Sequence, residues 1–102
     1  MKIVFAPGTL ALIESHRAAE TNLPIGVIQS ARIKLTALRA APDIRTIQGW
    51  QSLGYRSANY GSSAEHSIVV TPGWELNMHF EIEQGVTYIV VIGVRECRRE
   101  FV

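Results

Sequence analysis

The sequence predicts an α+β domain in which helices come first along the chain and an antiparallel β-sheet follows. Three patterns support this prediction. Apolar and polar side chains alternate from Trp74 to Glu83, apolar residues recur at helical spacing from Ile25 onward, and the β-branched run from Val86 to Arg95 is hydrophobic almost throughout. Side chains on a strand point alternately to opposite faces, whereas helices repeat every ~3.6 residues, so these patterns indicate a strand, a helix and a second strand. The predicted order is β-α-α-β-β-β-β.

The N-terminal half is predicted to hold a short strand and two helices. Residues 3–6 form the strand, which ends at a Pro-Gly pair. Thr9 suits the N-cap of a first helix over residues 10–20, and Pro24 suits the first turn of a second helix over residues 25–41. The outer side of the second helix is expected to be a solvated face, with the basic residues Arg32, Lys34 and Arg39.

The C-terminal half is predicted to be β throughout. A connection over residues 42–54, with one helical turn at most, leads into strands over residues 53–61 and 65–71. Pro72 and Gly73 occupy the second and third positions of a type II turn. The alternating strand follows, and the β-branched run after it is expected to be a central strand covered on both faces.

The register of the last hairpin decides which residues share the polar face. A two-residue loop would put Tyr88 and Val90 on that face, and the core would lose their side chains. We therefore predict a three-residue loop with Gly85 in the left-handed conformation. In this register Phe80 lies opposite Tyr88, and Met78 lies opposite Val90.

The same register predicts a polar face with the composition of a binding site. It places Arg95 within diagonal reach of Glu75, and similar counting around the preceding turn sets His66 opposite His79. The predicted members are His66, His79, Asn77, Glu75, Glu81 and Arg95, with Tyr60 and Arg56 from the neighbouring strand. Antiparallel sheets often leave one face to water. Because the helices must cover the other face, we nevertheless expect this one to be a binding surface.

Composition narrows the class of function. Lys and Arg number 10 and Asp and Glu number 9, so no overall field draws the chain to nucleic acid or membranes. Cys97 is the single cysteine, and neither a metal nor another cofactor is expected, because zinc sites need several Cys or His at close spacing. No apolar run approaches the ~20 residues of a membrane span. We expect one cytoplasmic domain over residues 1–102, whose local basic cluster is Arg95, Arg98 and Arg99.

Two segments match a known family pattern. They are "ARIKLTALRAAPDI" in the second predicted helix and "HSIVVTPGWELNMHFEIEQGVTYIVVI" in the strands. An alanine-rich helix with scattered Lys and Arg, then W-S-I-x-V, a turn, W-R-I-x-F-x-F, a Gly turn and a valine-rich strand is the pattern of the HigB-like branch of the RelE/ParE superfamily of bacterial toxins. The chain resembles this branch from Ile25 to Arg95.

The resemblance implies both a fold and a function. The fold is a small α+β domain in which two helices pack on one face of a twisted antiparallel sheet. The function is that of the toxin in a type II toxin–antitoxin pair, neutralised by a cognate antitoxin. Many such toxins cut messenger RNA on the ribosome, whereas ParE-like members are associated with inhibition of DNA gyrase. No residue of this chain singles out the gyrase-directed version.

Three positions depart from the family pattern. Glu75 stands where the family has the arginine of W-R-I, Tyr60 stands where a lysine precedes glycine, and Val94-Arg95-Glu96 replaces the closing D-Y-H. A glutamate repels the negative charge that grows on a scissile phosphate, whereas an arginine stabilises it. The departures leave open a catalytically inactive RelE-fold module that binds a protein partner.

Replacement catalytic groups are nevertheless present in the sequence. Cutting RNA through its 2′-hydroxyl needs a base, an acid and a cation. His66 or His79 could serve as base or acid, and Glu75 or Glu96 as a second proton carrier. The candidate cations are Arg95 and Arg56, and the candidate RNA contacts are Tyr60, Arg98 and Arg99.

Overall fold

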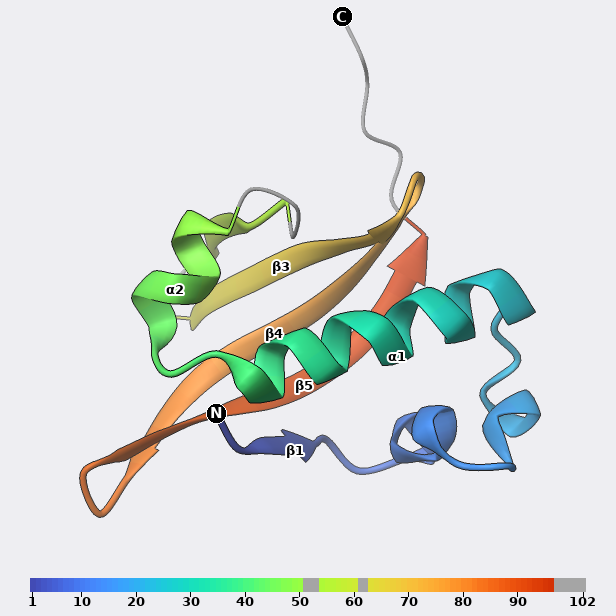
Figure 1. Ribbon diagram of the computed structural model, residues 1–102, viewed down its shortest axis with the longest axis horizontal. Coiled ribbons are helices and arrows are strands. Elements are labelled where there is room, and N and C mark those ends of the chain that lie inside the picture. Colours follow the sequence, from blue (N-terminus) through green and yellow to red (C-terminus); the bar gives the residue numbers. More distant parts are fainter. Residues whose placement is uncertain (51–53, 61–62, 97–102) are drawn as a thin grey trace, which may run out of the picture.

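Within the described residues, five strands form one mixed sheet in the order β1-β5-β4-β3-β2, and helices cover one of its faces (Figure 1). The computed structural model describes residues 1–50, 54–60 and 63–96, with the backbone alone at 57–60, 63 and 64. The strands are β1 (Ile3–Phe5), β2 (Arg56–Tyr60), β3 (Ser63–Thr71), β4 (Trp74–Glu83) and β5 (Val86–Glu96). The predicted α+β fold, with N-terminal helices on one face of a largely antiparallel sheet, is confirmed.

Helix α1 (Ile25–Ala40) supplies most of the layer over the sheet. It begins after Pro24, as predicted, and ends before Pro42, because proline cannot continue the backbone hydrogen-bond ladder. Its buried stripe is Val27, Ile28, Ala31, Leu35 and Leu38. These side chains share one core with Ile68, Val70, Leu76, Met78, Ile89 and Val91 from three strands.

The helix predicted over residues 10–20 is wrong. Two short 3₁₀ helices occupy this stretch, η1 (Thr9–Glu14) and η2 (Ala18–Thr21). The reason lies between them: the Ser15 hydroxyl donates to the carbonyl of Leu12 (2.8 Å) and accepts from the amide of Arg17 (3.0 Å). A serine that bonds its own backbone in this way competes with the α-helical ladder.

The basic side of α1 is exposed at Arg32 and Arg39, as expected of a solvated face, but both side chains also bond a neighbouring segment. Arg32 donates to the carbonyls of Ile13 (2.7 Å) and Ser15 (2.8 Å), and Arg39 forms an ion pair with Glu14. These bonds tie the 3₁₀ segment to α1. The two arginines therefore have a structural role that the sequence alone did not predict.

A second α-helix, α2 (Ile44–Gly49), lies in the predicted connection. Asp43 caps its N-terminus by accepting from the amide of Thr46 (2.9 Å), which holds the pKa of that carboxyl below its usual value. Ile47 is fully buried in the shared core. The helix therefore packs on the same side of the sheet as α1 (Figure 1).

The β4–β5 turn is shorter than predicted. Gln84 and Gly85 form a two-residue loop with φ of 52° and 79°, the positive values that a type I′ hairpin turn requires. The predicted three-residue loop is wrong. Phe80 pairs with Ile89 instead of Tyr88, and Glu81 takes Tyr88 as its partner.

A β-bulge then changes the register in the middle of the same hairpin. Met78 pairs with Val91 but Asn77 pairs with Gly93, so Ile92 is the extra residue. The shift brings Arg95 directly opposite Glu75, where the sequence predicted a diagonal approach. Strand β5 lies between β1 and β4, as expected of a central strand. The expectation that both of its faces are covered is wrong.

Strand β1 completes the sheet by pairing with β5 in parallel, at the edge. At the other hairpin, Gly73 has φ of 88°, as the predicted type II turn requires. No helix among the described residues is long and apolar enough to cross a membrane.

Candidate functional site

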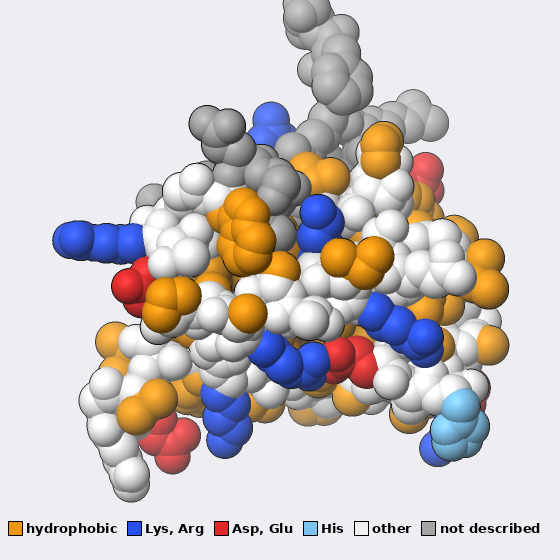
Figure 2. All heavy atoms as spheres, in the orientation of Figure 1, with side chains coloured by type: hydrophobic (Ala, Val, Ile, Leu, Met, Phe, Trp, Pro, Cys, Tyr) orange, Lys and Arg blue, Asp and Glu red, His pale blue; other side chains and the backbone are white. Residues whose placement is uncertain are grey.

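The polar side chains of β4 lie on the face of the sheet that faces away from α1 and α2. Directly opposed residues of paired strands share a face, so Ser67, Asn77 and Gly93 lie together on this side. We call it the uncovered face, because no described helix lies across it. Figure 2, which views the molecule from the helix side, shows charges of both signs scattered between apolar side chains on the described part of that side.

Arg95 forms two ion pairs on the uncovered face. Its Nε donates to Glu75 Oε1 (3.4 Å), and one terminal nitrogen donates to Glu65 Oε1 (3.2 Å). The Glu75 side chain is only 9% exposed, whereas that of Arg95 is 60% exposed. The predicted neighbourhood of Arg95 and Glu75 is therefore confirmed, and Glu65 is a member that the sequence reasoning missed.

The Arg95 side chain spans several levels of the sheet. Glu75 pairs with Val69 at one level, and Glu65 lies four residues earlier on β3. The level of Asn77, which pairs with Ser67, lies between them. The guanidinium therefore bridges carboxylates whose backbone positions lie on either side of the Asn77 level.

Asn77 is buried although no described helix covers its face. Backbone and side chain taken together, Asn77 is 3% exposed and Glu75 is 7% exposed. The Asn77 amide nitrogen donates to Glu75 Oε1 (3.3 Å), which sets the orientation of the amide, and its oxygen Oδ1 has no hydrogen-bond partner. Buried acceptors are nearly always paired, so this oxygen is exceptional.

Three further side chains form a hydrogen-bonded chain beside this group. His79 Nε2 bonds Glu81 Oε1 (2.9 Å), and the Tyr88 hydroxyl donates to Glu81 Oε2 (2.7 Å). The hydrogen bond from Tyr88, and to a smaller extent that with His79, lowers the pKa of Glu81. The same bond raises the pKa of Tyr88, so its proton is retained at neutral pH. Tyr88 joins this face only because the turn has two residues.

His66 lies on the opposite face from His79. The predicted pairing of the two histidines is wrong, because His66 pairs with Met78, whose side chain belongs to the core. Its ring contacts Phe80 (centroids 4.7 Å apart) and stacks on Tyr55, whose hydroxyl is hydrogen-bonded to His66 Nδ1. Partial burial, followed by the charge of His79, lowers the pKa of His66 and favours the neutral ring.

The remaining predicted site residues are dispersed or lie outside the description. Arg56 is exposed at the start of β2 and shares the uncovered face, because it pairs with Ser67. Glu96 pairs with Trp74, a residue packed against the core, and so lies on the covered side. The side chain of Tyr60 and the whole of Arg98 and Arg99 lie outside the described residues.

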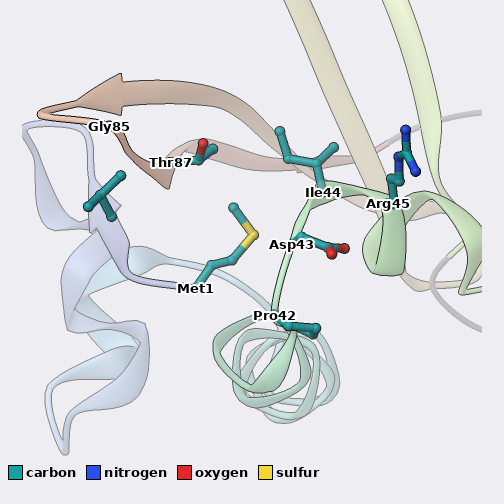
Figure 3. Close-up of a pocket in the computed structure, with 8 residues that line it drawn as sticks. Met1, Pro42, Asp43, Ile44, Arg45, Gly85 and Thr87 are labelled. Carbon is teal, nitrogen blue, oxygen red and sulfur yellow. The ribbon is translucent and has the colours of Figure 1, made fainter.

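A separate pocket opens on the side of the molecule near the N-terminus. Its volume is about 630 Å³, and it lies between Met1, residues 42–45 and residues 85–87 (Figure 3). None of the predicted site residues lines it. Its one carboxylate, Asp43, is already engaged as the cap of α2. In the described part of the chain, no group of three or more His, Cys, Asp or Glu side chains is placed to hold a metal ion.

The uncovered face therefore combines a cation, proton carriers and buried acceptors. Arg95 can stabilise an anion only if it leaves its two carboxylates, whereas His79, Glu81 and Tyr88 already form a path for protons. Sequence reasoning found Arg95, Glu75, Asn77, His79 and Glu81. A two-residue hairpin turn would have added Tyr88, and the period of two along β3 would have added Glu65.

Comparison with known proteins adds no further constraint. No protein-family model matches the chain, and no curated protein or solved structure matches it. The residues of the uncovered face and the fold are therefore the observations that bear on function.

Proposed function

We propose that this chain is the toxin component of a type II toxin–antitoxin pair, held inactive by a cognate antitoxin in the cytoplasm. One observation carries the proposal: the segment that resembles HigB-like toxins places Glu75, Asn77, His79, Glu81 and Arg95 on a single face that no described helix covers. The α+β arrangement, with helices followed by a mixed sheet, is compatible with a RelE-like fold.

In this proposal the activity is cleavage of messenger RNA on the ribosome. His79, supported by Glu81, accepts the proton of the attacking 2′-hydroxyl. Tyr88, which keeps its proton at neutral pH, donates to the leaving 5′-oxygen. Arg95 moves from its carboxylates to the phosphate and stabilises the charge of the phosphorane. Mutation of either His79 or Arg95 should therefore lower the cleavage rate by about a hundredfold or more.

Expression of the chain without any antitoxin in bacteria tests the proposal. We expect growth arrest together with loss of messenger RNA, measured by RNA sequencing. His79→Ala and Arg95→Gln should relieve the arrest. Two exposed residues outside the site provide matched controls, His16→Ala and Arg45→Gln, which should leave the arrest unchanged.

Each outcome bears on a different part of the proposal. Arrest that survives both His79→Ala and Arg95→Gln would refute the site assignment but not the toxin function. Arrest without loss of messenger RNA would point away from an endoribonuclease and toward a target such as gyrase. Harmless expression at a verified protein level would refute the toxin function.

The second candidate is a catalytically inactive RelE-fold module that binds a protein partner. The ion pairs of Arg95 favour it, because the candidate cation is held by Glu75 at the position where the resemblance implies arginine. Co-expression with the protein from a neighbouring reading frame separates the two candidates. A stable complex combined with harmless expression would support the module, whereas a complex that abolishes arrest would support the toxin.

A further inference from the structure

The uncovered face holds a cluster of hydrogen-bond acceptors in which one buried oxygen, Asn77 Oδ1, has no partner among the described residues. We define the acceptor cluster as Glu65, Glu75 and Asn77. Asn77 is 3% exposed, and its Oδ1 has no partner, while its nitrogen is held by Glu75 (3.3 Å). Rotating the amide by half a turn would bring Oδ1 against the carboxylate, so the unpaired acceptor cannot be relieved locally. Only a further donor can therefore satisfy Asn77 Oδ1.

Arg95 fills this requirement only in part. A guanidinium has five N–H donors, and Arg95 directs two nitrogens to carboxylates at 3.4 and 3.2 Å. Neither bond goes to Asn77 Oδ1. The Arg95 side chain is also 60% exposed, although its partner Glu75 is only 9% exposed, so solvent and an external group can reach the guanidinium. An internal cation that remains open to solvent can be replaced by an external one.

We propose that the acceptor cluster receives a guanidinium from a protein partner, which displaces Arg95 and also donates to Asn77 Oδ1. The charge of the face favours a basic segment: among the described residues it carries four carboxylates, Glu65, Glu75, Glu81 and Glu83, against three cations, Lys2, Arg56 and Arg95. A planar fork of donors matches neighbouring carboxylates better than an ammonium does. The proposal names the chemistry of the partner and rests on the proposed function only in taking that partner to be the antitoxin.

Binding of a capped tri-arginine peptide to the purified chain tests the proposal. Its affinity is measured by NMR titration, with the side-chain amide of Asn77 as the local reporter. We expect the peptide to shift that amide signal, and we expect capped tri-lysine to bind more weakly. Arg95→Gln removes the internal competitor and should strengthen tri-arginine binding by about fivefold or more.

Arg56→Gln is the matched control, because it removes the same charge from the same face at a position on β2, two strands away from Asn77. It should change the affinity by less than about twofold. Equal effects of Arg56→Gln and Arg95→Gln would show a general response to charge and would overturn the proposal. In the Arg95→Gln background, Asn77→Ser should cancel most of the gain; circular dichroism checks that this variant folds.

Two other outcomes would also overturn the proposal. One is a peptide that shifts only signals remote from Asn77. The other is a tri-lysine peptide that binds as tightly as tri-arginine, because the proposal depends on the planar fork of the guanidinium. The measurement uses the purified chain alone and needs neither ribosome nor antitoxin. Failure here would therefore refute the proposed partner chemistry but would not refute the toxin function.

Discussion

The two faces of the sheet bury their side chains by different means. On the covered face, helices α1 and α2 and the 3₁₀ segment enclose apolar residues such as Leu76 and Met78, which are fully buried. On the uncovered face, Glu75 and Asn77 are nearly as inaccessible, although their neighbours are polar and no described helix lies over them. The comparison shows that polar groups can be buried on a sheet without a helix over them. Here they are buried next to the side chain of Arg95.

The two kinds of burial should respond differently to mutation. Apolar burial on the covered face depends on volume, because a cavity loses both transfer free energy and contacts. Polar burial on the uncovered face depends on a few hydrogen bonds, whose net contributions are small and coupled. Loss of one residue on the covered face should therefore cost more than loss of one on the uncovered face.

The largest effect is expected in the core of the covered face. Leu76→Ala should lower the free energy of unfolding by about 3 kcal/mol, because Leu76 is fully buried. Val90→Ala, on the uncovered face opposite His79, should lower it by less than about 1 kcal/mol. Urea denaturation measures both values. Equal losses at the two positions would mean that the uncovered face is packed as tightly as the covered one.

A smaller effect is expected from the ion pair of the uncovered face. In a double-mutant cycle of Glu75→Gln and Arg95→Gln, the coupling free energy should be about 0.5 to 1 kcal/mol, because Arg95 remains largely exposed to solvent and salt. Unfolding in urea at low and high salt provides the measurement. Glu20→Gln with Arg17→Gln, an exposed pair at the start of η2, is the matched control and should be more sensitive to salt. Strictly additive substitutions would show that Arg95 does not support the burial of Glu75.

The smallest effect is a dependence of stability on pH that comes from the covered face. The folded pKa of His66 lies below its usual value of 6.5, so the unfolded chain binds more protons once the pH falls below that value. His66 should therefore destabilise the fold progressively as the pH falls from about 7 to about 5.5.

The measurement for His66 is the urea midpoint across that pH range. His66→Gln should flatten the slope, whereas His16→Gln, at an exposed position between the 3₁₀ helices, should retain it. A slope that rises toward acid in the wild-type chain would contradict the stacked, neutral His66 that the structure shows.

Local sequence patterns predicted the elements that have one clearly apolar face. The alternation from Trp74 to Glu83 became β4, and the helical spacing from residue 25 became α1, with nearly the predicted boundaries. These features depend on neighbours in sequence, so the sequence alone determined them.

Tertiary structure decided every feature that depends on how segments meet. The two-residue turn puts Tyr88 on the uncovered face, and the bulge at Ile92 restores the apolar register and aligns Arg95 with Glu75. The pairing of β3 with β4 sends His66 to the core side. A period of two specifies that faces alternate but not which register two strands adopt, because a turn or a bulge of one residue exchanges the faces. The partners of a site residue therefore follow from the register, which only the folded sheet determines.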